Sequence, residues 1–225
     1  MTLSKKIPLV LSALTALVAL IAAPAASAAG SVSTTKACFV DEGSEGVSVG
    51  VSGSGFTPGE QVFAQIPAPG GLAGFSEAVV APDGTVNTTI EHVFPEGIDP
   101  VAEEMKIQIA GVLTQQVLAE SAFQITNLGV ATKPAVAPFN KVVKYTFAGF
   151  RPGKPIFGHF QSGGKVVLTY KFGKASGPCG ILHTKSRLFP GHASDNAKFK
   201  VQFDDSKKLS KKSSPKIVTG LGSTF

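Results

Sequence analysis

The segment Gly149-Phe150-Arg151-Pro152-Gly153 repeats a pattern found 94 positions earlier (149 minus 55) in Gly55-Phe56-Thr57-Pro58-Gly59. In each copy a Pro-Gly pair separates two stretches in which apolar residues alternate. Proline presets φ for the second position of a turn, and glycine adopts the positive φ that a type II turn requires next. We therefore predict structural turns at Pro58-Gly59 and at Pro152-Gly153, each joining the two strands of a β-hairpin with one buried face.

The residues around the two turns keep the same offset. Before the turn, Val49 and Val51 correspond to Val143 and Tyr145. After it, a second set corresponds in the same way: Val62, Ala64 and Ile66 with Ile156, Gly158 and Phe160. This agreement predicts that the chain contains two copies of one β-domain.

Residues 1–28 have the features of a signal peptide. Lys5 and Lys6 precede an apolar run over residues 7–23, and Ala26-Ser27-Ala28 is a small-x-small cleavage site. We expect a secreted, extracellular protein that begins at Ala29. A retained membrane anchor is the alternative, which the short run and the cleavage motif disfavour.

Short apolar stretches separated by Gly-Pro-rich turns are typical of an antiparallel β-sandwich. We expect a first domain over residues 29–127, a linker over 128–138 and a second domain over 139–225. A helix is the alternative over residues 102–122, where alternation at Met105, Ile107 and Ile109 favours strands. The expected strands of the first domain are 36–40, 46–53, 61–66, 75–80, 85–93, 105–110 and 117–125. Those of the second are 142–148, 155–161, 165–172, 180–184, 198–203 and 216–221.

Charge divides sharply between the two halves of the chain after residue 28. Residues 29–128 contain two basic and twelve acidic residues, a net charge of −10. Residues 129–225 contain seventeen basic and three acidic residues, a net charge of +14. An asymmetry of this size predicts either a polyanionic partner for the second domain or docking of the two domains.

Three stretches of the second domain carry a family resemblance: residues 145–153, Gly177-Pro178-Cys179-Gly180, and Val201-Gln202-Phe203-Asp204. With the repeated turn, they resemble the Ig-like β-sandwich modules of secreted proteins from high-GC Gram-positive bacteria. The resemblance implies two tandem Ig-like sandwiches in an extracellular location, and it implies no activity. Each predicted domain has a single cysteine and no tryptophan, so the intersheet disulfide of antibody domains is absent and the strand order stays open.

Cys38 and Cys179 are the two cysteines of the chain. An exported protein with two cysteines usually pairs them, which here would join the two domains. Two buried free thiols and an intermolecular bridge are the alternatives.

Other polar residues are weak candidates for chemistry. Cys179, His183 and His192 lack a fourth ligand for a structural zinc site and an orienting group for a nucleophile. The acidic clusters at residues 41–45 and 96–99 lack the spacing of a calcium loop. We expect no catalytic site, no metal and no cofactor, with a hydrolase as the disfavoured third reading.

A basic run lies between the last two expected strands of the second domain. Its lysines are the candidate polyanion-binding residues: Lys207, Lys208, Lys211, Lys212 and Lys216. Stacking aromatics or a known nucleic-acid module are missing from the run, so specific nucleic-acid binding is not expected. We predict a non-enzymatic cell-envelope binding or structural protein that contacts an anionic polymer or lipid surface. The alternative is a carrier of a small apolar ligand in a cleft lined by the second domain's phenylalanines; the oligomeric state is left open.

Overall fold

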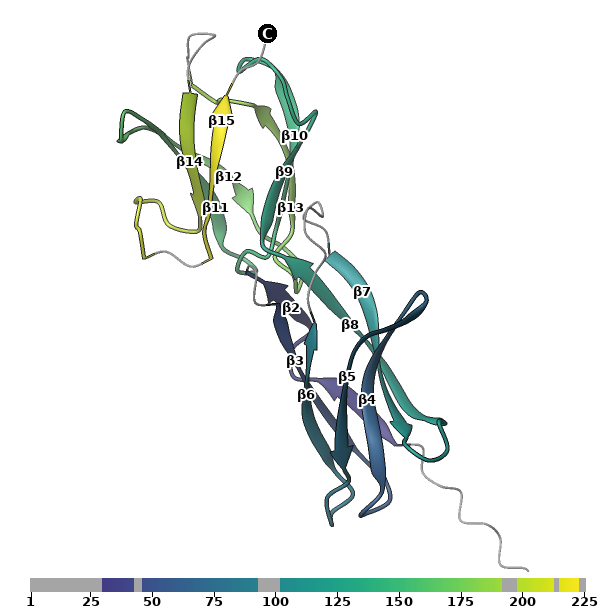
Figure 1. The fold of residues 1–225 in the computed structure, drawn as a ribbon. Coiled ribbons are helices and arrows are strands. Elements are labelled where there is room, and N and C mark those ends of the chain that lie inside the picture. The colour runs from purple at the N-terminus through teal and green to yellow at the C-terminus, as the bar shows by residue number, and fades with distance from the viewer. Residues whose placement is uncertain (1–29, 43–45, 93–101, 192–197, 213–214, 223–225) are drawn as a thin grey trace, which may run out of the picture.

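The computed structural model describes residues 30–42, 46–92, 102–191, 198–212 and 215–222, which form strands and connecting turns (Figure 1). The predicted signal peptide and His192 lie outside these residues. Within them, no helix is long and apolar enough to cross a membrane. The strands of the first half are β1 Ser31–Thr34, β2 Cys38–Asp41, β3 Val47–Ser54, β4 Gln61–Ala68, β5 Gly71–Val79, β6 Val86–His92, β7 Ala102–Gly111 and β8 Val117–Asn127. Those of the second half are β9 Gly129–Lys133, β10 Val142–Ala148, β11 Pro155–Ser162, β12 Lys165–Lys174, β13 Leu182–Arg187, β14 Lys198–Asp204 and β15 Ile217–Gly222.

The first domain is a sandwich of two sheets. One sheet has the order β1-β3-β6 and the other has the order β2-β8-β7-β4-β5. Every pairing is antiparallel except that of β2 with β8, which is parallel. Alternate side chains of both sheets meet in one core, which is built mainly of valine and isoleucine, for example Val49, Val51, Ile66, Ile90 and Ile107.

The second domain repeats this plan. Its sheets have the orders β13-β10-β9 and β12-β11-β14-β15, and β4 and β11 begin and end 94 positions apart (155 minus 61, 162 minus 68). Each domain therefore places the first, second and fifth strands of the repeat in one sheet and the remaining strands in the other, apart from the added β2. Two antiparallel sheets with this crossing order form an Ig-like sandwich, and the all-β prediction of two tandem Ig-like domains is confirmed.

Both Pro-Gly turns form, but they do not join the strands of a hairpin. Gly59 has φ of 78° and Gly153 has φ of 76°, and in each turn the amide after glycine donates to the carbonyl three residues earlier (Glu60 to Thr57 and Lys154 to Arg151, both 3.1 Å). However, β3 and β4 lie in different sheets, as do β10 and β11. The hairpin prediction is wrong, because alternation places one face of each strand in the core whether the next strand pairs with it or packs across from it.

Gly163-Gly164 forms a hairpin turn in the second domain. It joins β11 to β12, which are neighbours in one sheet, and both glycines have positive φ (56° and 76°). Two successive residues at positive φ define the turn whose twist matches that of paired strands.

The junction between the domains differs from the prediction of a linker over residues 128–138. Only Leu128 separates β8 from β9, and β9 pairs with β10 inside the second domain. Cys38 of β2 forms a disulfide with Cys179, which lies in the connection between β12 and β13. Of the three states left open for these cysteines, the structure contains the interdomain pair. The two domains are thus joined covalently twice, by the peptide chain at Leu128 and by the disulfide, which restricts how they can turn relative to each other.

Candidate polyanion interface

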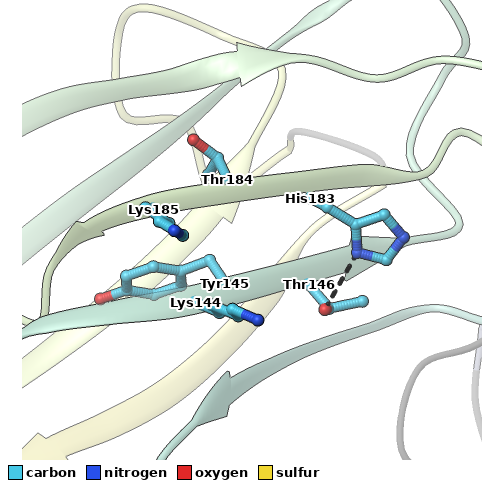
Figure 2. A pocket seen from close by; sticks show the side chains of 6 residues that line it. All are labelled: Lys144, Tyr145, Thr146, His183, Thr184 and Lys185. Carbon is cyan, nitrogen blue, oxygen red and sulfur yellow. Dashed lines mark hydrogen bonds between the residues drawn. The ribbon is translucent and has the colours of Figure 1, made fainter.

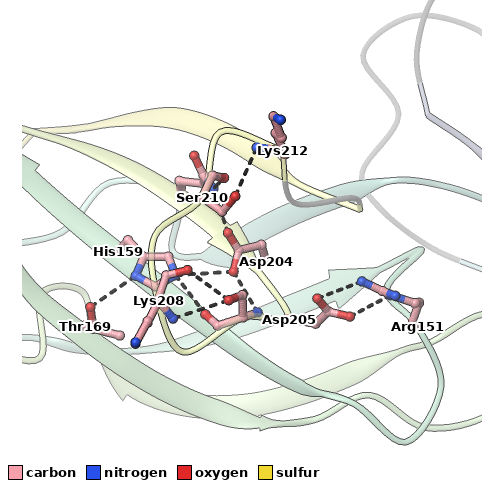
Figure 3. A network of polar contacts seen from close by, with 10 residues as sticks. Arg151, His159, Thr169, Asp204, Asp205, Lys208, Ser210 and Lys212 are labelled. Carbon is pink, nitrogen blue, oxygen red and sulfur yellow. Dashed lines mark hydrogen bonds and ion pairs between the residues drawn. The ribbon is translucent and has the colours of Figure 1, made fainter.

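The basic run of the second domain lies in the connection between β14 and β15, which we call the lysine loop; the structure describes its residues 205–212, 215 and 216. On β14, Phe199, Val201 and Phe203 face the core, so Gln202 and Asp204 face the opposite side of the sheet. Gln202 is only 5% exposed and Asp204 is fully buried, because the loop folds back over this side (Figure 3). The loop is therefore packed on the sheet.

His159 of β11 lies at the centre of the contacts beneath the loop. Its side chain is fully buried and lies directly across from Gln202 in the strand register. Nε2 is 3.2 Å from Oδ1 of Asp204 and 3.0 Å from the carbonyl oxygen of Ser206, so Nε2 is the donor to these two acceptors. Nδ1 is 3.1 Å from the hydroxyl of Thr169 on β12. The buried His159 side chain thus links β11 to β12, to β14 and to the start of the lysine loop.

Asp204 and Gln202 hold the loop backbone at two further points. Oδ1 of Asp204 accepts the amide of Ser206 at 2.9 Å, and Oδ2 accepts Nε2 of Gln202 at 2.6 Å. The same Gln202 nitrogen donates to the carbonyl of Ser210 at 2.8 Å. A buried carboxylate is stabilised only when it is paired and hydrogen-bonded, and these contacts meet that requirement.

Arg151, from the repeated turn, holds the start of the loop. Its guanidinium forms a two-pronged ion pair with Asp205, with Nε at 2.6 Å from Oδ2 and the terminal nitrogen at 2.9 Å from Oδ1 (Figure 3). The Asp205 side chain is 9% exposed. The geometry matches the planar fork of arginine to the two oxygens of a carboxylate, a pairing that lysine cannot make.

The anchored loop presents four exposed lysines to solvent: Lys207, Lys208, Lys211 and Lys212. Lys216 is also exposed, but its ammonium group donates to the carbonyl of Lys211 within the loop. The two described aspartates of this domain are engaged with His159 and Arg151. Within the described part of the chain, the salt bridges leave these five lysines without a carboxylate partner.

The other residues considered for chemistry are not brought together. Cys179 has no free thiol because it is bonded to Cys38, so it cannot serve as a nucleophile. His183 is exposed and its Nδ1 lies 3.2 Å from the hydroxyl of Thr146. Among the described residues, no group of three or more metal-ligating side chains is close enough to hold an ion. Of the acidic clusters, residues 96–99 and Glu45 lie outside the described residues, whereas Asp41 is buried and Glu42 is exposed.

Eight phenylalanines of the second domain lie in its buried core. Phe147 and Phe160 are fully buried, and Phe189 stacks on Phe199 with ring centroids 4.3 Å apart. Two surface grooves of about 630 Å³ and 600 Å³ do occur on this domain, but none of their lining residues is a phenylalanine. The rings that were expected to line a carrier's cleft therefore pack against one another.

The sequence analysis missed the network beneath the lysine loop. Alternation along β11 places His159 opposite to the core-facing Phe160, which indicates an exposed side chain. The available signal was a histidine on the outward side of the expected strand 155–161 and an aspartate, Asp204, directly after the expected strand 198–203. The pattern of the strands contains no information about a later loop that covers them.

No known protein-family model matches the chain, and no curated protein matches it. Among solved structures, a tetra-tandem repeat from the extending region of a large adhesion protein is 11% identical over 85% of this chain, with a TM-score of 0.28. The chain covers 47% of that fragment's length. The human OSCAR ligand-binding domain is 10% identical over 86% of this chain and 97% of its own, with a TM-score of 0.33. Likeness at this level carries no argument about function, which depends on the site itself.

Proposed function

We propose that the chain is a secreted, non-enzymatic protein of the cell envelope whose basic second domain binds polyanionic surfaces through the lysine loop. The observation that carries the proposal is the anchoring of this loop. A flexible lysine run loses conformational entropy when it binds, whereas a loop already fixed by buried contacts loses less. Lys207, Lys208, Lys211 and Lys212 are thus preorganised in one exposed region.

The charge balance supports the same proposal. The second domain carries +14 and the first −10, yet exposed ion pairs contribute only about 0–1 kcal/mol each and are screened within about 8 Å at physiological salt. Opposite net charge alone is therefore too weak to cover the lysine loop with the first domain. The loop stays available to an external polyanion.

The ligand chemistry is a repeated phosphate or phosphodiester, which occurs both in wall polymers and in lipid headgroups. The test uses the full-length oxidised chain with two probes, a poly(glycerol phosphate) polymer and vesicles containing phosphatidylglycerol, with phosphatidylcholine vesicles as the neutral reference. Binding to the polymer alone identifies a wall ligand, whereas binding to anionic vesicles alone identifies a membrane surface.

The decisive variant is the fourfold change of Lys207, Lys208, Lys211 and Lys212 to Gln. Each phosphate contact releases about one counterion, so the variant should lower the slope of log affinity against log salt by up to about 3–4. The matched control removes the same charge from exposed lysines elsewhere in the domain: Lys154, Lys165, Lys171 and Lys174. Binding that survives high salt, or an equal loss in both variants, would contradict a role for the loop.

A further inference from the structure

A second group of lysines lies on the other sheet of the same domain. Lys144 on β10 is directly opposite Lys133 on β9 and directly opposite Lys185 on β13. All three side chains are exposed, and they form one row across three neighbouring strands. With strands about 4.8 Å apart, the row is about 10 Å long. We call it the lysine row.

The lysine row lowers the stability of the protein without ligand. Like charges directly opposite each other on a sheet destabilise it, and here the middle lysine faces one on each side. None of the three has an ion-pair partner among the described residues. Arg187, exposed and opposite Val142, adds a further positive charge beside the row. An uncompensated row of this kind suits a ligand that supplies the missing negative charge.

The surface around the row is hollowed. One groove of about 630 Å³ is lined by residues of β10 and β13, including Lys144, Thr146, His183 and Lys185 (Figure 2). A second groove of about 600 Å³ is lined by Lys133, Pro134, Val142 and again by Lys144 and Lys185. Because they share these two lysines, the two grooves meet at the row. A ligand can therefore extend across the strands.

We propose that the lysine row is a separate anion-binding site for a linear phosphate chain lying across β9, β10 and β13. The ammonium group is a compact point charge that binds phosphate oxygens without requiring a planar partner. Because the three lysines lie on neighbouring strands and not at one point, together they suit a chain of phosphates better than one isolated anion. The lysine loop packs on the other sheet of the sandwich, so this site does not depend on it.

The experiment titrates inorganic tripolyphosphate and monophosphate into the full-length oxidised chain by calorimetry. Tripolyphosphate should bind at least about tenfold more tightly, since each additional charge-assisted contact contributes roughly a factor of ten. Lys144→Gln should lower the affinity for tripolyphosphate about tenfold. Lys165 is an exposed lysine on β12, and Lys165→Gln should leave this affinity unchanged.

Thermal melting of the free protein gives an independent readout. Lys144→Gln should raise the melting temperature, because it removes the two like-charge pairs at the centre of the row. A residue that merely supported the fold would lower it.

The fourfold lysine-loop variant separates this site from the proposed function. Loss of polymer binding with unchanged tripolyphosphate binding supports two separate sites. Equal affinity for the two phosphates, or unchanged tripolyphosphate binding in Lys144→Gln, would overturn the proposal for the row whatever happens to polymer binding.

Discussion

The two domains share a strand order but differ in the connection between their last two strands. In the first domain, β7 and β8 are joined by residues 112–116, where the Gln115 amide donates to the Gly111 carbonyl at 2.9 Å. In the second domain, the lysine loop joins the last two strands, β14 and β15. The repeated turn also differs between the domains at one position, which is Thr57 in the first copy and Arg151 in the second. Because Arg151 binds Asp205, the turn of the second domain also holds its added surface.

The cores of the two domains differ in the kind of side chain that fills them. Val51 and Ile66 in the first domain correspond to Tyr145 and Phe160 in the second, and all four are buried. The same sandwich is thus built around aliphatic side chains in one copy and aromatic side chains in the other. Burial of apolar area at alternate positions determines the fold, whereas the identity of each side chain adjusts the local packing.

The largest predicted effect concerns the bond that joins the two domains. The disulfide spans 141 positions, and closure of so long a loop contributes about 4–5 kcal/mol to the free energy of unfolding on the chain-entropy model. We expect the double variant Cys38→Ser/Cys179→Ser to lose this amount in urea denaturation and to unfold in two transitions, one per domain. An unchanged midpoint with a single transition would mean that the bond does not couple the domains.

A smaller effect concerns how the stability of the second domain depends on pH, because this domain contains both tyrosines of the chain. Burial raises the pKa of the Tyr145 hydroxyl well above its usual range, and this hydroxyl donates to the carbonyl of Leu188 at 2.7 Å. The fold therefore favours the neutral phenol. The stabilisation is complete below about pH 10, where unfolded tyrosine is also neutral, and it is lost as pH rises further, by about 1.4 kcal/mol per unit.

The variant Tyr145→Phe isolates this contribution from the titration of the many lysines. It should cost about 1 kcal/mol at neutral pH, because the Leu188 carbonyl loses its donor, and it should lose less stability than the parent above pH 10. Urea denaturation across this range measures both quantities. Parallel loss of stability in the two proteins would contradict the assignment.

The smallest predicted effect is the loss of stability when alanine replaces the glycine of either Pro-Gly turn. A Cβ at Gly59 or at Gly153 would meet no atom within 4 Å, so alanine adds only the strain of a positive φ. We expect Gly59→Ala and Gly153→Ala to cost about 1 kcal/mol each, with nearly equal shifts in melting temperature for their own domains. Clearly unequal costs would mean that the two turns are not equivalent.

Sequence reasoning predicted the domains' fold because alternation and turn residues are local signals. It missed β1 and β9, the corresponding first strands of the two domains, because each is short and its partner strand comes later in the chain. The lysine row was not visible for the same reason. Lys133 lay in the expected linker, and the expected strand 180–184 ended before Lys185. The five loop lysines could be identified from composition, whereas their anchoring by His159, Asp204 and Arg151 depends on contacts between distant segments.

The central claim is that one shared fold presents a polyanion-binding surface in the second domain alone. Hydrogen exchange of the full-length oxidised chain, with and without poly(glycerol phosphate), tests it most directly. We predict slower exchange in residues 198–212 and 215–222, with no change in β3 to β8 of the first domain. Protection of the first domain's strands, or none in the second domain at low salt, would contradict the account.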